Sequence, residues 1–519
     1  MPPQIYLDSN ASNAVLPQAV AAARAAMEQD YGNPSSTHVA GLRAKALLET
    51  VRQRAARVLG AGDGRLMFNS GATEGIHTAV LSALVALRER RAAGHPVGRW
   101  LVYGATEHKA VPESLTHWNR LLGLDLDIVA LPVDGEGRHD LARLHTLAPE
   151  TALLCTMAAN NETGVISDLA GIEQALLTSG SSALWLVDGV QALGKLPLKL
   201  AATRIDYAPF SGHKLYAPKG IGLLYVRAGA PFTPLMVGGG QEAGDRSGTE
   251  NMAGIAALGA VLAVLEDGRT FGSPQQLAAR RDQIAAALRS AFRGLCFNTP
   301  FDKSLPTTLN FSVPGLASQA LLNLFDAAGL RVSAGSACSS GQAAPSHVLA
   351  AMQLPDWRSR SAIRLSFGPL VEPQTIADAC DAIARCGNAL QRSGRLTAPA
   401  LEDGAPTTVG GEPAAELAIV DAPSLGAFLQ RHPDALLVDV RERYEHDAGG
   451  GLTMGGCVAL NVPMASLNAQ ADRWLQPQAP PLVFICKSGQ RAHRAAAWMR
   501  GLGHAQAWFL NGGLTAHSG

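Results

Sequence analysis

The sequence lacks an excess of charge of either sign. Its 519 residues include 43 Lys and Arg and 43 Asp and Glu, so the formal net charge is zero with neutral histidines. A strong field of one sign is what draws proteins to nucleic acids and to anionic membranes. We therefore expect neither nucleic acid nor a membrane among the direct partners.

The chain also lacks a long uninterrupted apolar stretch. The most apolar candidate helix, from Met252 to Leu265, contains Gly254 and Gly259 and is shorter than the roughly 20 residues that a membrane span needs. The first residues show neither the basic cluster nor the apolar core of a signal peptide. A buried helix in a cytoplasmic protein is the expectation.

Cysteines are few, odd in number and scattered, and none shows CxxC spacing or a histidine at metal-ligand distance. This usage in a long chain excludes a disulfide framework and argues against a zinc site. Five of the seven lie in contexts that we interpret as packing positions: Cys155, Cys296, Cys380, Cys386 and Cys457. Cys338 and Cys486 are left as candidate nucleophiles.

The length and the 47% hydrophobic content predict several folding units, and no internal repeat is visible. Between residues 60 and 226, short β-rich runs alternate with helical stretches, which is typical of a mostly parallel sheet covered by helices. The predicted strands are Arg65–Asn69, Leu101–Tyr103, Asp127–Leu131, Ala152–Met157, Leu184–Asp188, Tyr207–Ser211 and Gly222–Val226.

Changes in pattern divide the chain further. A large α/β domain is expected over residues 17–266, and a smaller α+β domain over 267–394, to which residues 1–16 would return. Residues 395–416 are rich in Ala, Pro, Gly and Thr and predict a linker. Residues 417–519 form a third predicted unit, with strands at Leu436–Val440 and Leu482–Ile485.

Small residues follow the first predicted strand, in Ser70-Gly71-Ala72-Thr73-Glu74, and a helical stretch comes next. Such residues let a phosphate approach the N–H groups of a helix N-terminus, with the Thr73 hydroxyl as a further donor. Alone, the motif indicates no more than an ordinary helix cap.

Polar side chains follow the other strands, at the edge of the sheet where ligands bind in α/β proteins. They are His108, Asn161, Asp188, Gln191, Ser211, His213 and Lys214. A buried Asp needs a cationic partner, and a lysine in such a setting can attack an aldehyde to form a Schiff base. Singly, Lys214 could be a turn residue and His108 a structural one. Together they are the set that pyridoxal 5'-phosphate requires.

The sequence resembles the cysteine desulfurases of the class V aminotransferase family, which have the fold-type I architecture, over roughly residues 4 to 392. The resemblance is carried by Tyr31-Gly32-Asn33-Pro34, Ser70-Gly71-Ala72-Thr73-Glu74, Thr106-Glu107-His108, Asn160-Asn161-Glu162, Asp188-Gly189-Val190-Gln191, Ser211-Gly212-His213-Lys214 and Arg246-Ser247-Gly248-Thr249. One departure is Ser9-Asn10-Ala11-Ser12-Asn13, where the family usually has aromatic and Thr residues.

The resemblance implies a role for each motif residue. Lys214 would form the internal aldimine, Asp188 would pair with the pyridine nitrogen, and His108 would stack on the ring. Asn161 and Gln191 would contact the ring substituents, and Arg364 and Asn161 would bind the substrate, Arg364 through its carboxylate. Thr249 would reach the phosphate of a neighbouring subunit, which implies a homodimer. The residues implied to hold the phosphate in their own subunit are Ala72, Thr73, Ser211 and His213.

Cys338 lies among small residues in Ser336-Ala337-Cys338-Ser339-Ser340, a setting that exposes a thiol. In the desulfurases this loop carries the nucleophile that takes sulfur from cysteine, and its length here is similar to that of the persulfide-donating group I. The alternatives are a buried Cys in a turn, or a selenocysteine lyase or aminotransferase in which Cys338 is dispensable.

Cys486 begins the run Cys486-Lys487-Ser488-Gly489-Gln490-Arg491, which follows a predicted strand and precedes a helix. Backbone N–H groups and cations around such a site stabilise a sulfur anion. With Asp439-Val440-Arg441-Glu442 and Asn511-Gly512-Gly513, this run resembles a rhodanese domain with the six-residue loop of the sulfurtransferases.

These features predict that sulfur from L-cysteine passes to Cys338, then to Cys486, and on to an acceptor protein or small thiol. The linker of about 20 residues would act as a flexible tether reaching some 25 Å. Transfer within a chain and across a dimer both stay open, as does the alternative that the last domain is only a docking module.

Overall fold

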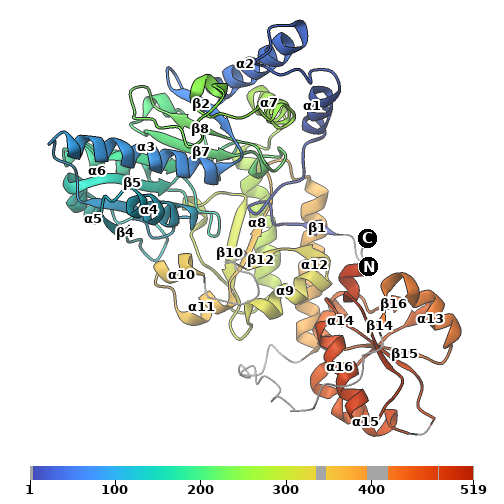
Figure 1. Ribbon diagram of the computed structural model, residues 1–519. Helices are drawn as coiled ribbons and strands as arrows, with labels where there is room; N and C mark the ends of the chain where they lie inside the picture. The colour runs from blue at the N-terminus through green and yellow to red at the C-terminus, as the bar shows by residue number, and fades with distance from the viewer. Residues whose placement is uncertain (1–3, 335–345, 394–418, 477, 518–519) are drawn as a thin grey trace.

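The computed structural model of the chain describes residues 4–334, 346–393, 419–476 and 478–517. Figure 1 shows two units in the first 393 residues, with the C-terminal unit beside the second of them. The predicted linker and Cys338 lie outside the described residues, so the boundaries expected from sequence stay predictions.

The large unit is built on a seven-stranded sheet, and the mostly parallel arrangement predicted from sequence is confirmed. Its order is β2 (Arg65–Asn69), β8 (Gly222–Val226), β7 (Tyr207–Ser211), β6 (Leu184–Asp188), β5 (Thr151–Met157), β3 (Trp100–Gly104) and β4 (Asp127–Leu131). Only β8 runs antiparallel to its neighbours. Strands β5, β7 and β8 are buried at every residue, as strands covered on both faces must be.

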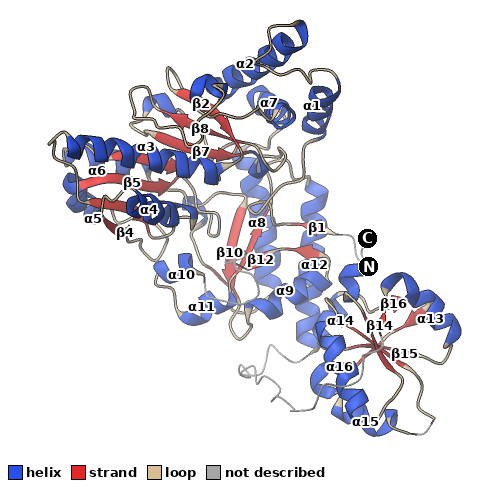
Figure 2. Ribbon diagram, viewed as in Figure 1, coloured by secondary structure: helices blue, strands red, loops and turns tan. Residues whose placement is uncertain are grey.

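Helices cover both faces of this sheet (Figure 2). One face packs against α3 (Ala72–Ala92) and α4 (Ala110–Leu121), and the other carries α2 (Val39–Leu59), α6 (Leu169–Thr178) and α7 (Met252–Asp267). Helix α1 (Pro17–Glu28) packs on α7. The buried helix expected from Met252 is α7, capped by the Asn251 side chain, which accepts from the Gly254 N–H.

The small unit combines two sheets with long helices. Strands β12 (Ser333–Ala334), β13 (Ile363–Ser366), β10 (Thr308–Ser312) and β9 (Cys296–Phe297) form an antiparallel sheet, and β1 (Ile5–Tyr6) pairs with β11 (Leu330–Arg331). The N-terminal strand thus returns to this unit. Its core is closed by α8 (Pro274–Ala291), α9 (Ser318–Ala327) and α12 (Pro373–Arg392).

The C-terminal unit has a five-stranded parallel sheet in the order β14 (Ile419–Val420), β20 (Ala507–Leu510), β19 (Leu482–Ile485), β15 (Leu436–Asp439) and β18 (Leu460–Asn461). The sequence predicted β15 and β19 but missed the other three. Its helices are α13 (Leu425–Arg431), α14 (Arg443–Ala448), α15 (Asn468–Trp474) and α16 (Gln490–Gly501).

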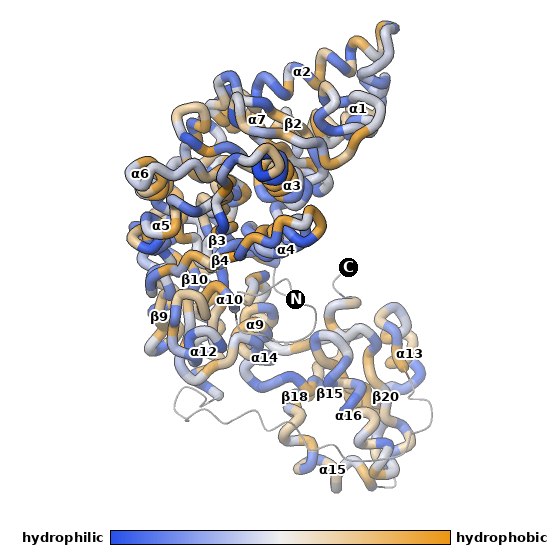
Figure 3. Tube along the Cα trace, turned by 60° about the vertical axis from the view of Figure 1, so that its left-hand side comes forward, coloured by the Kyte–Doolittle hydropathy of each residue, from blue (hydrophilic) through white to orange (hydrophobic). Residues whose placement is uncertain are grey.

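Hydrophobic and hydrophilic residues alternate along α2 in Figure 3, as expected for a helix with one face on the core. Within the described part of the chain, no helix has the length and apolarity needed to cross a membrane.

Candidate active sites

A cavity of about 730 Å³ lies beyond the carboxyl ends of the large sheet, within the size range of small-molecule sites. Its walls come from the ends of β5, β6 and β7, from the start of α3, and from the small unit. It is lined by all but one of the residues predicted to bind the cofactor, namely Ala72, Thr73, His108, Asn161, Asp188, Gln191, Ser211, His213 and Lys214. Arg364, the predicted substrate residue, lines it too.

Lys214 ends the short turn that follows β7. Its Nζ donates to the backbone carbonyls of Asn10 and Ala11, at 2.7 and 2.8 Å. The N-terminal segment is held in place in turn, because the Asn13 side chain donates to the Lys214 carbonyl at 2.8 Å. The lysine amine therefore lies at the junction of the two units, held by a segment some 200 residues away in the chain.

Asp188 ends β6 and is buried. Burial raises the pKa of this carboxyl to about 6, although the Val190 N–H and the charge of Lys214 oppose the rise. Glu107, for which the sequence predicted no role, lies nearby. Burial and the charge of Asp188 raise the Glu107 pKa well above its usual value, which favours the protonated acid. A cation placed beside Asp188 would offset the cost of its burial.

His108 follows β3, and one hydrogen bond fixes which ring nitrogen carries the proton. Its Nδ1 accepts from the Ala110 N–H at 3.2 Å, so in the neutral ring the proton is on Nε2. Burial, with the charges of Lys214 and His347, lowers the His108 pKa. A neutral imidazole is suited to lie flat against an aromatic ring.

Gln191 is oriented by a second lysine that the sequence analysis missed. The Lys195 Nζ donates to Gln191 Oε1 at 2.6 Å and to Asn10 Oδ1 at 3.1 Å. Burial and the charges of Lys214 and Arg364 lower the pKa of Lys195 to about 7. The Gln191 amide nitrogen donates to the Asn10 carbonyl at 3.1 Å, so its second N–H is the group left to donate to a ligand.

The start of α3 fits an anion. Gly71 precedes it with φ 151°, and no side chain caps the first N–H groups. Glu74 is drawn away, accepting from the Ser70 N–H at 2.8 Å and pairing with Arg246 at 3.0 Å. The free N–H groups and the helix dipole therefore favour a phosphate beside Thr73.

Arg364 lies in β13 and is 3% exposed. Its Nη2 donates to Asp8 at 2.6 Å and its Nη1 to the Asn161 carbonyl at 3.1 Å, while its Nε has no partner among the described residues. A buried guanidinium with an unused donor can bind a small carboxylate. Asp8, for which the sequence predicted no role, also accepts from Ser333 at 2.7 Å.

The described cavity lining does not account for two of the predicted residues. Thr249 is exposed and is absent from the lining. Cys338 lies outside the described residues, whose nearest members on either side are Ala334 and Ser346.

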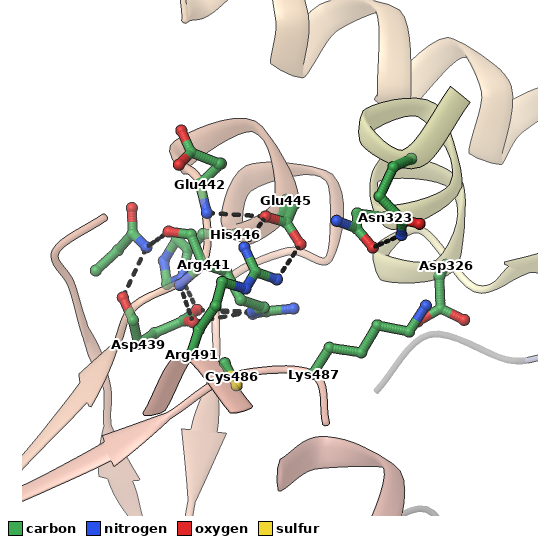
Figure 4. Close-up of polar contacts among 12 residues, drawn as sticks. Asn323, Asp326, Asp439, Arg441, Glu442, Glu445, His446, Cys486, Lys487 and Arg491 are labelled. Carbon is green, nitrogen blue, oxygen red and sulfur yellow. Dashed lines mark hydrogen bonds and ion pairs between the residues drawn. The ribbon is translucent and has the colours of Figure 1, made fainter. Parts of the chain in front are cut away.

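The second site surrounds Cys486 at the end of β19 (Figure 4). The thiol is buried, and its Sγ accepts from the Ala492 N–H in the first turn of α16 at 3.3 Å. Gly489 permits this return of the chain with φ 86°. The N-terminal turn of α16 therefore directs a backbone N–H at the sulfur.

The two cations of the Cys486 loop each pair with a carboxylate from another element. Arg491 donates to both oxygens of Glu445, at 2.7 and 2.8 Å. Lys487 instead reaches Asp326 of α9, in the small unit, at 3.2 Å (Figure 4). Ser488 and Gln490 are exposed.

Comparison with known proteins agrees with this arrangement. The aminotransferase class-V family profile matches residues 5–377, and the rhodanese-like domain profile matches residues 424–518. A cysteine desulfurase of Cereibacter sphaeroides is 38% identical over 366 residues, which cover 70% of this chain and 90% of that protein.

Solved structures are similar as well. A NifS-like protein superposes with a TM-score of 0.66 at 30% identity, covering 75% of this chain and all of the other. A structure described as SspA in complex with cysteine gives 0.60 at 26% identity, covering 70% of this chain and 99% of the other. The chain belongs to the class-V aminotransferase family, as a cysteine desulfurase with a C-terminal rhodanese-like domain.

Proposed function

We propose that the cavity binds pyridoxal 5'-phosphate and that the chain passes sulfur from L-cysteine to Cys338 and then to Cys486. Members of this family depend on that cofactor. One observation carries the proposal: Lys214, Asp188 and the uncapped start of α3 line a single cavity.

The cofactor would be held by groups of matching chemistry. The start of α3, with Thr73, Ser211 and His213, would bind the phosphate. Burial and the charge of Lys214 lower the pKa of His213 to about 4, which favours a neutral imidazole before a phosphate binds. Asp188 would pair with the ring nitrogen, Gln191 would donate to the ring oxygen, and His108 would lie against the ring. When bound, the cofactor supplies an electron sink for a carbanion next to the amino group.

The chain itself binds and orients the substrate. Arg364 would take the cysteine carboxylate through its unused Nε, helped by Asn161. The SspA structure shows that a protein similar to this one holds cysteine. The Lys214 amine and the Nε2 proton of His108 are the groups placed to move protons at the substrate.

The transfer of sulfur from cysteine to Cys338 needs no added oxidant. The Cys338 thiolate attacks the sulfur of the bound cysteine, an S–S bond forms, and the C–S bond breaks. The carbon skeleton takes up a proton and leaves as alanine. Cys338 then carries a persulfide, which the thiolate of Cys486 can attack in the same way. The final acceptor is a protein or a small thiol.

The Cys338→Ala variant tests the first transfer. It should form no alanine and release no sulfide from cysteine in the presence of a reductant, while still binding the cofactor. Unchanged activity would support a selenocysteine lyase or an aminotransferase instead.

The Cys486→Ala variant tests the relay. It should form alanine at the normal rate with reductant but lose delivery of sulfur to a protein acceptor. Delivery that continues unchanged would mean that the C-terminal unit only docks a partner.

A homodimer is part of the proposal, because exposed Thr249 would contact the phosphate bound in a neighbouring subunit. Light scattering should give twice the mass of the chain. Thr249→Ala should weaken cofactor binding without changing that mass.

A further inference from the structure

The rhodanese-like unit is packed against the desulfurase by an apolar contact. Its helix α14 lies against α9 and α12, as Figures 1 and 3 show. Tyr444 and Ala448 of α14 are 4% and 1% exposed and join the core of the small unit. A side chain at Gly449 would come within 3.1 Å of the Ala327 carbonyl. Domains joined by such a buried apolar contact are held in one arrangement rather than tethered loosely.

Asp326, at the end of α9, connects two positions that matter for sulfur transfer. Its Oδ2 pairs with the Lys487 Nζ at 3.2 Å, and its Oδ1 accepts from Arg331 at 2.7 Å. Lys487 is the residue next to Cys486. Arg331 lies in β11, and the chain runs from it through β12 to the segment that contains Cys338.

We propose that Asp326 positions the Cys486 loop against the small unit, so that the rhodanese-like domain receives sulfur from the desulfurase domain of its own chain. This inference rests on the proposed relay and chooses transfer within a chain over transfer between chains.

The ion pair with Lys487 is suited to positioning rather than to stability. The Lys487 and Asp326 side chains are 33% and 28% exposed, and pairs this exposed contribute little to the stability of a fold. The apolar contact of α14 holds the units together, and Asp326 sets where the loop lies within that contact. In-line attack is sensitive to such placement, because a misplacement of about 1 Å can slow a reaction about 100-fold.

The transfer itself exchanges one S–S bond for another. The Cys486 thiolate attacks the terminal sulfur of the persulfide on Cys338, and a new S–S bond forms at Cys486. The old S–S bond breaks and Cys338 leaves as a thiolate, while the transferred sulfur keeps its proton. Nothing is oxidised or reduced overall.

The test compares Asp326→Asn with Asp447→Asn in the full-length holoenzyme. Asp447 pairs with Arg392 at 3.7 Å in the same interface but does not touch the Cys486 loop. After one turnover with cysteine, quenched samples are analysed by mass spectrometry for sulfur on each thiol. Asp326→Asn should slow transfer to Cys486 by up to about fivefold, the most that a pair this exposed can contribute, and Asp447→Asn should not slow it.

Two further readouts separate positioning from a general structural effect. Alanine formation with reductant, and sulfur transfer from thiosulfate to cyanide through Cys486, should both stay unchanged in Asp326→Asn. Asp326→Glu should restore part of the transfer rate. A wild-type transfer rate in Asp326→Asn would overturn the positioning role.

A mixing experiment tests transfer within the chain. Differently tagged Cys338→Ala and Cys486→Ala chains are mixed, and are also co-expressed, before cysteine is added. Cys486 of the Cys338→Ala chain should stay free of sulfur. Labelling at the wild-type rate would overturn the inference. If the wild-type chain forms no persulfide on Cys338, the proposed function itself fails.

Discussion

The cavity around Lys214 and the loop around Cys486 differ in how completely their buried charged groups are paired. In the cavity, Arg364 Nε has no partner among the described residues, and burial raises the pKa of Asp188. Around the loop, Arg491 is bound at both nitrogens by Glu445, and Arg441 by Asp439.

The difference reflects what each site holds. A cofactor and an amino acid bring charges that can complete the cavity, so unsatisfied groups there are binding groups. A single sulfur atom brings little charge to the loop. The ion pairs around the loop are therefore complete before sulfur arrives. Substitutions in the cavity should therefore change ligand binding before stability, and substitutions around the loop should do the reverse.

The largest effect is expected at the loop, from Glu445→Gln. It leaves the half-buried Arg491 without a carboxylate partner, which costs about 3 kcal/mol. Urea unfolding should show an early transition of the C-terminal unit, with thiosulfate sulfur transfer lost. Glu28→Gln, in the exposed pair with Arg24, serves as the control and should cost less than about 1 kcal/mol. Equal stability of the two variants would break the comparison.

In the cavity, Asp188→Asn should stabilise the cofactor-free protein at pH 7 while weakening cofactor binding. The native carboxyl has its pKa raised to about 6, so above that pH its burial as an anion lowers stability. The cost is about 3 kcal/mol and disappears as pH falls from about 6 to about 4, where the carboxyl is protonated in both states. Urea midpoints of both cofactor-free proteins at pH 7, 5 and 4 check this. A difference between the two urea midpoints that widens at low pH would contradict this prediction.

Arg364→Ala should lower kcat/KM for cysteine about 100-fold, mainly through KM, because a charge-assisted pair with the substrate carboxylate is lost. Asp8→Asn is the matched control, since it removes the negative charge of the partner at 2.6 Å but keeps the guanidinium. Alanine formation over a range of cysteine concentrations gives both constants. The same loss in both variants would mean that Arg364 acts only as the partner of Asp8.

The smallest effect is expected from Lys195→Met, which leaves the Gln191 amide oxygen without its donor at 2.6 Å. One charged hydrogen bond is lost, so we expect about a tenfold drop in kcat and a shifted absorbance of the bound cofactor. Lys199→Met, farther along the same segment and outside the cavity, should change neither. An unaltered spectrum in Lys195→Met would show that Lys195 does not orient Gln191.

The sequence predicted the large sheet closely because its strands are continuous apolar runs, and β2, β4, β6, β7 and β8 have the predicted bounds. Residues at the ends of those runs then had to share one edge of the sheet, and they line one cavity. Lys195 could have been found as well, since it lies one helical turn after Gln191, a spacing that brings side chains together.

Contacts between distant segments could not be predicted in this way. No local pattern shows that the carbonyls of Asn10 and Ala11 accept from Lys214. The two-residue strands β14 and β18 are too short to carry a period. Nor does the six-residue helix α14 reveal that Tyr444 packs in the core of another unit. The packed interface of the C-terminal unit could not be predicted either, because its burial depends on α9 and α12. The linker lies outside the described residues and stays a prediction.

The most direct test of the account is to locate sulfur on the thiols of the wild-type holoenzyme after a single turnover with cysteine. Mass spectrometry of quenched samples should find an added sulfur first on Cys338 and then on Cys486. The Cys338→Ala chain should carry added sulfur on neither thiol. Sulfur that reaches Cys486 from cysteine in the Cys338→Ala chain would contradict the relay.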